Sequence, residues 1–135
     1  MIDANTVVSA ALSPDGVPRR AVVAARRKGC IALSEAVHRE IAEVLTRPKF
    51  ARVLTADRRQ EILELLAAAA LWVEPKEKVV DCRDAKDNCY LELALAAGAA
   101  VVISGDADLL TLDPWRGIRV LRPAQFLDMI GRMEA

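Results

Sequence analysis

Residues 81–110 read DCRDAKDNCYLELALAAGAAVVISGDADLL, and this stretch decides the fold. From Asp87 onwards, apolar residues recur at the spacing of one helix face, and Gly98 provides a natural helix end. The short apolar, β-branched run at 101–103 then predicts a strand that is buried on both faces. A helix followed directly by such a strand is the repeating unit of a parallel α/β sheet.

The same alternation of helix and strand continues along the whole chain. The pattern predicts strands at 1–2, 30–33, either 71–73 or 79–80, and 118–121, and helices at 6–12, 18–28, 35–45, 56–70 and from Pro123. Alternating elements imply an α/β fold with a mostly parallel sheet and helices on both faces. Because no linker or repeat interrupts the pattern, residues 1–135 are predicted to form a single domain.

Composition excludes several classes of protein. The 135 residues are 53% apolar but only 4% aromatic, so we expect a core of Ala, Val, Leu and Ile. No apolar run is long enough to span a membrane, and the N-terminus does not resemble a signal peptide. Three cysteines without a CxxC pair favour a reduced, cytoplasmic protein over a disulfide framework or a zinc site.

Charge is unevenly distributed although the net charge is zero. The first 59 residues hold 11 Lys and Arg against 6 Asp and Glu, whereas residues 60–135 hold 8 against 13. A basic half could face a polyanion while the acidic half binds a metal ion. Ordinary solvated helix faces explain the same distribution, so charge alone leaves both interpretations open.

Four carboxylates fall where an α/β sheet would bring them together. Asp3 follows the first strand, Asp106 follows the strand at 101–103, and Asp87 begins the helix before it. Glu40 lies on the margin of the apolar face of its helix, whereas Glu43 lies about 60° further toward solvent. Oxygen ligands of this kind suit Mg²⁺ or Mn²⁺, and without a cation they would repel one another. The cluster therefore predicts a divalent metal site.

Each acid alone has an ordinary alternative explanation. Asp84 and Asp108 stand at helix starts, where aspartate caps the helix or interacts favourably with its dipole. Glu43 can pair with basic residues one turn away. Other chemistries have little support, because His38 is the single histidine and no glycine-rich phosphate loop is present.

Taken together, four blocks of sequence resemble the PIN-domain nucleases. The blocks are Asp3-x-Asn5, the segment from Ser34 through Glu40 to Pro48, Asp84-x-x-Asp87, and Ser104-Gly105-Asp106-x-Asp108-Leu109-Leu110. They occur in the order and spacing of the family, and they are most similar to its toxin branch, which is related to the VapC ribonucleases. The resemblance implies an α/β/α sandwich with a mostly parallel sheet of about five strands.

The resemblance also implies an activity and a set of site residues. It implies Mg²⁺- or Mn²⁺-dependent hydrolysis of single-stranded RNA, with Asp3, Glu40, Asp87 and Asp106 as catalytic residues. The three aspartates would be the metal ligands. The residues expected to surround them are Asn5, Glu43, Asp84, Ser104 and Asp108. The implied partners are an antitoxin protein and a second copy of the chain, without a membrane.

Two alternatives stay open at this point. The segment before Asp3 is short, which favours a PIN-fold module that binds RNA or protein without cleaving. A small phosphohydrolase would instead use Asp106 as a nucleophile and Asp108 as an acid, and it would hydrolyse a phosphomonoester through an aspartyl-phosphate. RNA cleavage that depends on a divalent metal would distinguish the nuclease from both.

Overall fold

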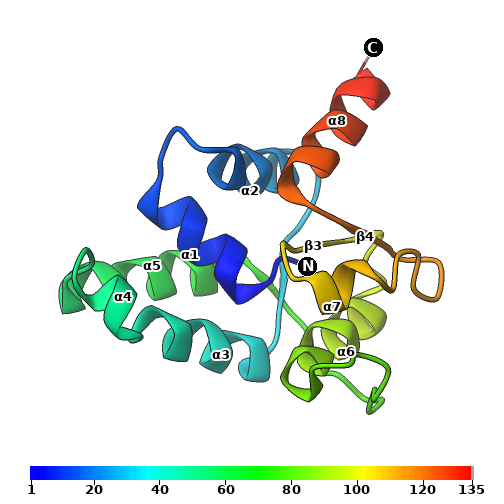
Figure 1. The fold of residues 1–135 in the computed structure, drawn as a ribbon, viewed down its shortest axis with the longest axis horizontal. Helices are drawn as coiled ribbons and strands as arrows, with labels where there is room; N and C mark the ends of the chain where they lie inside the picture. Colours follow the sequence, from blue (N-terminus) through cyan, green and yellow to red (C-terminus); the bar gives the residue numbers. More distant parts are fainter. Residues whose placement is uncertain (135) are drawn as a thin grey trace.

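The computed structural model describes residues 1–134, and Ala135 lies outside this part. Helices and short strands alternate along the chain (Figure 1), as the sequence predicts. The elements are α1 (Ala4–Leu12), α2 (Val17–Lys28), β1 (Ala32–Leu33), α3 (Glu35–Leu45), α4 (Pro48–Ala51), α5 (Ala56–Ala69), β2 (Leu71–Trp72), the 3₁₀ helix η1 (Ala85–Asp87), α6 (Asn88–Ala97), β3 (Val101–Ile103), α7 (Ala107–Leu110), β4 (Arg119–Leu121) and α8 (Pro123–Glu134).

The strands are parallel, but they do not form the predicted sheet of about five strands. β1 pairs with β2 and β3 pairs with β4, giving two separate two-stranded sheets within residues 1–134. A single bridge between Ile2 and Ile103 adds the start of the chain to β3.

The start of the chain is nevertheless held firmly against β3. Ile103 donates its N–H to the Met1 carbonyl at 2.8 Å, and Asp3 donates its N–H to the Ile103 carbonyl at 3.1 Å. These two bonds place Asp3 beside the carboxyl end of β3. The neighbouring strand ends therefore meet at one edge, as the alternating pattern predicts.

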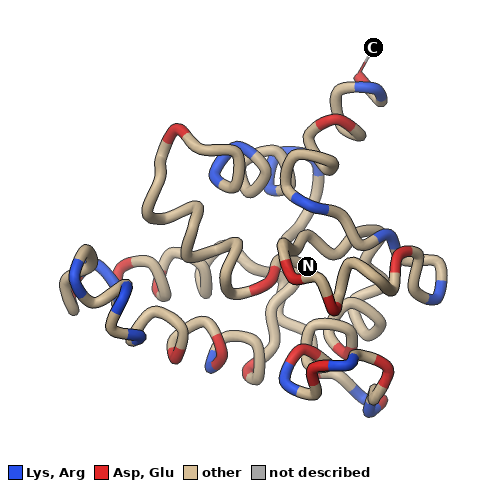
Figure 2. The backbone as a smooth tube through the Cα atoms, viewed as in Figure 1, with Lys and Arg blue, Asp and Glu red and all other residues tan. Residues whose placement is uncertain are grey.

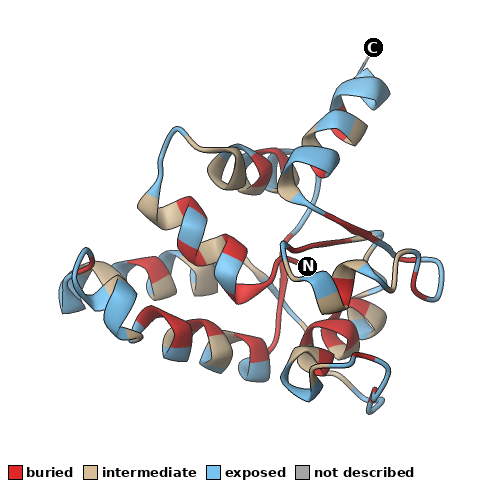
Figure 3. Cartoon of the chain, viewed as in Figure 1, coloured by how far each residue is buried: buried red, intermediate tan, exposed pale blue. Residues whose placement is uncertain are grey.

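Helices cover both faces of the strands. Ile103 and Leu121 pack toward α2 and α8, while their neighbours Val102 and Val120 belong to the larger core on the side of α3 and α6. This period of two is what a strand buried on both faces requires. Figure 1 shows α2 and α8 on one side of β3 and β4, and Figure 3 shows that the buried positions form a stripe along one face of α3. The chain thus has an α/β layered architecture.

Helix ends follow the sequence signals closely. Ser34 and Thr55 cap α3 and α5 with their hydroxyl groups, and Gly98 ends α6 in the left-handed conformation at φ 62°. Glycine adopts that conformation without the steric cost that a side chain would add. Capping residues therefore set the boundaries of these three helices.

Other elements differ in part from the expectations. The strand at 30–33 is reduced to two residues, and of the two alternatives for the next strand, the structure has the one at 71–73, as β2. Pro48 does more than stop α3, because it also begins the short helix α4. Leu65 is 61% exposed, because only one side of α5 packs against α3. Among the described helices, none is both long and apolar enough to cross a membrane.

Candidate functional site

Asp3 is the most deeply buried of the four predicted catalytic residues, with 2% of its surface exposed. Its Oδ1 accepts the Thr6 N–H at 2.9 Å and so caps α1, while its Oδ2 accepts the Ser104 hydroxyl proton. Burial raises the pKa of the Asp3 carboxyl above its usual range, and these hydrogen bonds partly offset the rise. The side chain therefore joins the beginning of α1 to the end of β3.

Asp106 lies on the same edge and is connected to Asp3 through Ser104. The Ser104 hydroxyl, itself fully buried, accepts the Asp106 N–H at 3.0 Å. The Asp106 Oδ1 accepts the Asp108 N–H at 2.8 Å and so caps α7. Its negative charge contributes to the raised pKa of Asp3, which means that the two carboxylates lie close enough to repel.

Asp87 completes a group of three aspartates. Its Oδ2 atom is buried and has no hydrogen-bond donor within residues 1–134, although the side chain as a whole is half-buried. Burial, as the largest cause, and the nearby charge of Asp106 together raise the pKa of Asp87 to about 7. Asp84 and Asp3 contribute smaller charge effects. Within residues 1–134, no Lys or Arg forms an ion pair with Asp3, Asp87 or Asp106, although Lys86 precedes Asp87 in η1.

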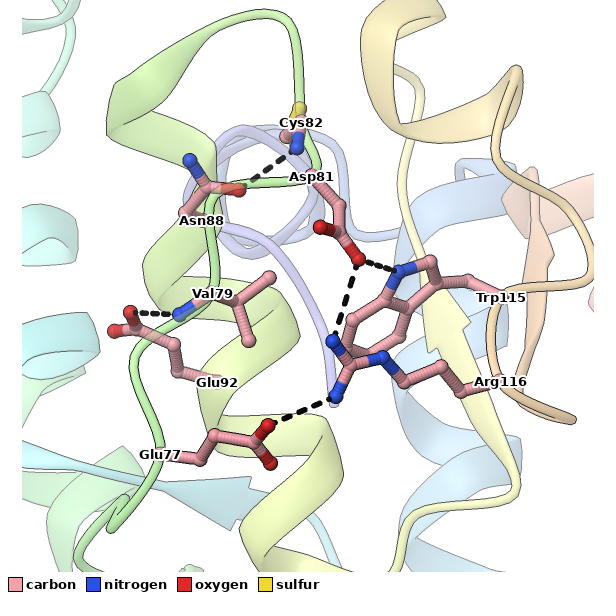
Figure 4. A network of polar contacts seen from close by, with 8 residues as sticks. All are labelled: Glu77, Val79, Asp81, Cys82, Asn88, Glu92, Trp115 and Arg116. Carbon is pink, nitrogen blue, oxygen red and sulfur yellow. Dashed lines mark hydrogen bonds and ion pairs between the residues drawn. The ribbon is translucent and has the colours of Figure 1, made fainter.

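A network of polar contacts fixes the loop that carries Asp84 and Asp87 (Figure 4). On one side, Cys82 donates its N–H to the Asn88 side-chain oxygen at 2.8 Å, and Val79 donates its N–H to Glu92 at 2.9 Å. Both acceptors belong to α6, so the loop is fastened to the helix that follows it. Asp84 then caps η1 by accepting the Lys86 N–H at 3.2 Å.

The other side of this loop is held by the turn before β4. The Trp115 indole N–H donates to Asp81 at 2.8 Å, and the Arg116 guanidinium bridges Asp81 at 3.5 Å and Glu77 at 3.2 Å. Figure 4 shows the two residues of the turn reaching the same loop that Asn88 and Glu92 hold from α6. The loop that precedes Asp87 is therefore held from two sides, by α6 and by the turn before β4.

Glu40 lies on α3 and is half-buried, at the margin of the apolar face as predicted. Burial, as the largest cause, and the negative charge of Glu40 raise the pKa of the Cys89 thiol to about 12. Glu40 therefore lies near the beginning of α6, the helix that Asp87 precedes. Glu43 is fully exposed one turn further along α3, and no described contact brings it to the three aspartates.

An open groove of about 490 Å³ begins at Asp106. Its lining residues are mostly small and polar: Asn5, Thr6, Ser9, Pro18, Gly105, Asp106 and Pro123. The exposed Asn5 side chain therefore faces the same space as Asp106. Two other grooves, around Trp72 and Glu92, have volumes of about 640 and 550 Å³, but they contain none of the three aspartates.

The donor chemistry of the site fits a hard divalent cation. The three aspartates offer oxygen atoms only, and the buried Asp87 Oδ2 lacks the positive partner that a buried carboxylate requires. Within residues 1–134, no three acidic, His or Cys side chains are already arranged to coordinate one ion. Asp3 and Asp106 use carboxylate oxygens to cap helices, so a cation would have to share these oxygens with backbone N–H groups.

Three residues that the sequence did not single out help to build the site. Thr6 donates to Asp3, Asn88 orders the loop before Asp87, and the Tyr90 hydroxyl oxygen accepts the Ala4 N–H at 3.2 Å. The sequence contains one indication for Tyr90: it lies on the apolar face of α6, where a buried hydroxyl group needs a hydrogen-bond partner. The other two contacts depend on how loops and helices meet in space.

Comparisons with known proteins agree with this architecture. The sequence matches the PIN domain family over residues 1–108. An uncharacterized protein of Methanocaldococcus jannaschii is 28% identical over 114 residues, which cover 83% of this chain and 73% of that protein. PIN domains are generally nucleases that use divalent metals. Because the match covers most of the chain, the protein belongs to the PIN domain family.

Proposed function

We propose that this protein is a divalent-metal-dependent endoribonuclease that cleaves single-stranded RNA. The observation that carries the proposal is the buried, unpartnered Oδ2 of Asp87 beside Asp106 and Asp3. Uncompensated carboxylates at the carboxyl edge of parallel strands are a costly arrangement unless a cation binds there. Membership of a nuclease family indicates which chemistry such a cation would serve.

Asp3, Asp87 and Asp106 would hold Mg²⁺ or Mn²⁺. A bound divalent cation polarises the scissile phosphate and lowers the pKa of water. With a cation bound, Asp87 would be held in its charged form, because a nearby positive charge favours the carboxylate. Ser104 keeps Asp3 oriented by donating to Oδ2. We assign Glu40 to accept the proton of the attacking water, because it is the half-buried acid beside the start of α6.

The groove that starts at Asp106 is the proposed path of the RNA strand. Asn5 and Ser9 offer hydrogen-bonding groups along it, which suits a polar, extended ligand. Lys86 lies on η1 beside Asp87, but Figure 2 shows that Lys and Arg are concentrated on α2 and around α4. These cations would bind phosphates further along the strand.

We further propose that the protein acts as the toxin of a toxin–antitoxin pair, as one domain and as a homodimer. The exposed apolar side chains of Leu65, Leu71 and Trp72 support a protein contact on α5 and β2. The three free cysteines are consistent with a reduced, cytoplasmic setting. A PIN-fold module that binds RNA without cleaving is the alternative, and the capping bonds that occupy Asp3 and Asp106 favour it.

Cleavage of a mixed-sequence single-stranded RNA distinguishes the two functions. The purified protein is incubated with Mg²⁺, with Mn²⁺ and with a chelator, beside an Asp106→Asn variant. The nuclease proposal expects cuts that require metal and fall by orders of magnitude in the variant. RNA binding without cleavage under either metal would support the binding module instead.

A further inference from the structure

Tyr90 makes a contact that its position in the core does not require. The side chain is only 4% exposed, and its hydroxyl oxygen accepts the Ala4 N–H at 3.2 Å, across 86 residues of sequence. A phenylalanine would fill the same apolar volume. The hydroxyl therefore has a purpose other than packing.

The hydrogen bond lies directly beside the buried aspartate of the site. The Ala4 N–H belongs to the peptide unit that follows Asp3, and it is one of the N–H groups at the beginning of α1 that have no partner within the helix. Asp3 itself caps a different N–H, that of Thr6. Asp3 and Tyr90 thus each accept one of the free N–H groups at the beginning of α1. The Tyr90 oxygen fixes the orientation of the peptide next to Asp3.

The same residue stands one helical turn after Asp87. Asp87 is the last residue of η1 and the N-cap residue of α6, and Tyr90 lies in the first turn of α6, so both side chains are positioned by the beginning of this helix. Burial raises the pKa of the Tyr90 phenol, and the charges of Asp3 and Glu40 raise it further. The hydroxyl therefore stays neutral and acts through hydrogen bonding alone.

We propose that Tyr90 is a positioning residue, whose hydroxyl couples the helix of Asp87 to the helix of Asp3 and sets their separation for a divalent cation. This inference rests on the proposed function, because it presupposes that these carboxylates bind metal. Tyr90 acts through the Asp3–Ala4 peptide and does not touch the ion. Groups that orient metal ligands in this way typically contribute 10- to 100-fold to metal affinity.

The test compares Tyr90→Phe with wild type in direct Mn²⁺ binding, measured from the electron paramagnetic resonance signal of the free ion. Tyr90→Phe keeps the ring and removes only the hydroxyl. Thr55→Ala is the matched control, because it removes one hydrogen bond, from Arg58 N–H at 3.1 Å, at the start of the distant helix α5. Hydrogen exchange of the Ala4 amide in metal-free protein adds a second readout.

We expect Tyr90→Phe to bind Mn²⁺ about tenfold more weakly and to exchange its Ala4 amide faster, while Thr55→Ala matches wild type in both. Unchanged Mn²⁺ affinity in folded Tyr90→Phe would overturn the inference. Equal weakening in Thr55→Ala would also overturn it, because the effect would then follow from lost stability. If wild type bound no Mn²⁺, the proposed function itself would fail, and that failure is distinguishable from the other two.

Discussion

Replacing Asp87 with asparagine should stabilise the metal-free protein while it abolishes cleavage. The pKa of Asp87 is raised from the usual 3.8 of an aspartate to about 7, so the folded state holds this proton more tightly than the unfolded chain. Ionising the carboxylate above that pKa therefore costs folding free energy. The penalty is absent below about pH 4, grows as the pH rises, and is complete above about pH 7. Asparagine removes it.

The size of the effect follows from the same shift. A displacement of about 3 pKa units corresponds to about 4 kcal/mol at most, at about 1.36 kcal/mol per unit. The Asp87 side chain is only half-buried, so solvent screening reduces the expected gain to about 1–2 kcal/mol at pH 8. For a chain of this length, that gain raises Tm by roughly 3–8 °C.

Thermal melts in the presence of a chelator, at pH 8 and at pH 4.5, test this reasoning. The control is Asp57→Asn, which makes the same change at an exposed acid in the first turn of α5 and should give no gain. An Asp87→Asn variant that melts no higher than wild type at pH 8 would refute the assigned repulsion. So would a gain that persists unchanged at pH 4.5.

Three further predictions concern the surroundings of Asp87. The Mn²⁺ affinity of the wild type should increase as the pH rises through about 7, because Asp87 must lose its proton before it binds the ion. Calorimetric titrations from pH 5.5 to 8 measure this affinity, and an affinity that does not change with pH would contradict the prediction. Ser104→Ala should lower the free energy of unfolding, measured in urea, by about 1–3 kcal/mol, because Asp3 Oδ2 and the Asp106 N–H both lose a buried hydrogen-bond partner. A loss under about 0.5 kcal/mol would contradict this prediction. Asn88→Ala should release the loop around Cys82, which faster hydrogen exchange of the Cys82 amide would detect, and unchanged exchange would show that other contacts suffice.

The proximity of the three aspartates was easier to predict than the sheet, and the reason is geometric. Asp3 and Asp106 follow extended segments, so parallel alternation alone places them on one edge, and the helix position of Asp87 brings it to the same place. A helix-wheel argument also placed Glu40 at the margin of the apolar face, and Glu40 is half-buried there. These inferences need only the periodicity of each element.

Predictions that depend on how elements meet were less successful. The first segment was expected to lead into a helix at about residue 6, but Asp3 caps α1 directly, so the helix begins at Ala4. Apolar composition alone could not distinguish the core face of α5 from the face that exposes Leu65. The contact between Tyr90 and Ala4 joins residues 86 positions apart, and local patterns contain no information about such pairs.

The most direct test of the central claim is RNA cleavage by Asp87→Asn and wild type, side by side, at pH 8 with Mn²⁺. Because the variant is expected to be at least as stable as wild type, loss of cleavage cannot be attributed to unfolding. The proposed site predicts metal-dependent cuts by wild type and a loss of orders of magnitude in the variant. Cleavage by folded Asp87→Asn at the wild-type rate would show that the aspartate cluster is not the metal-dependent active site.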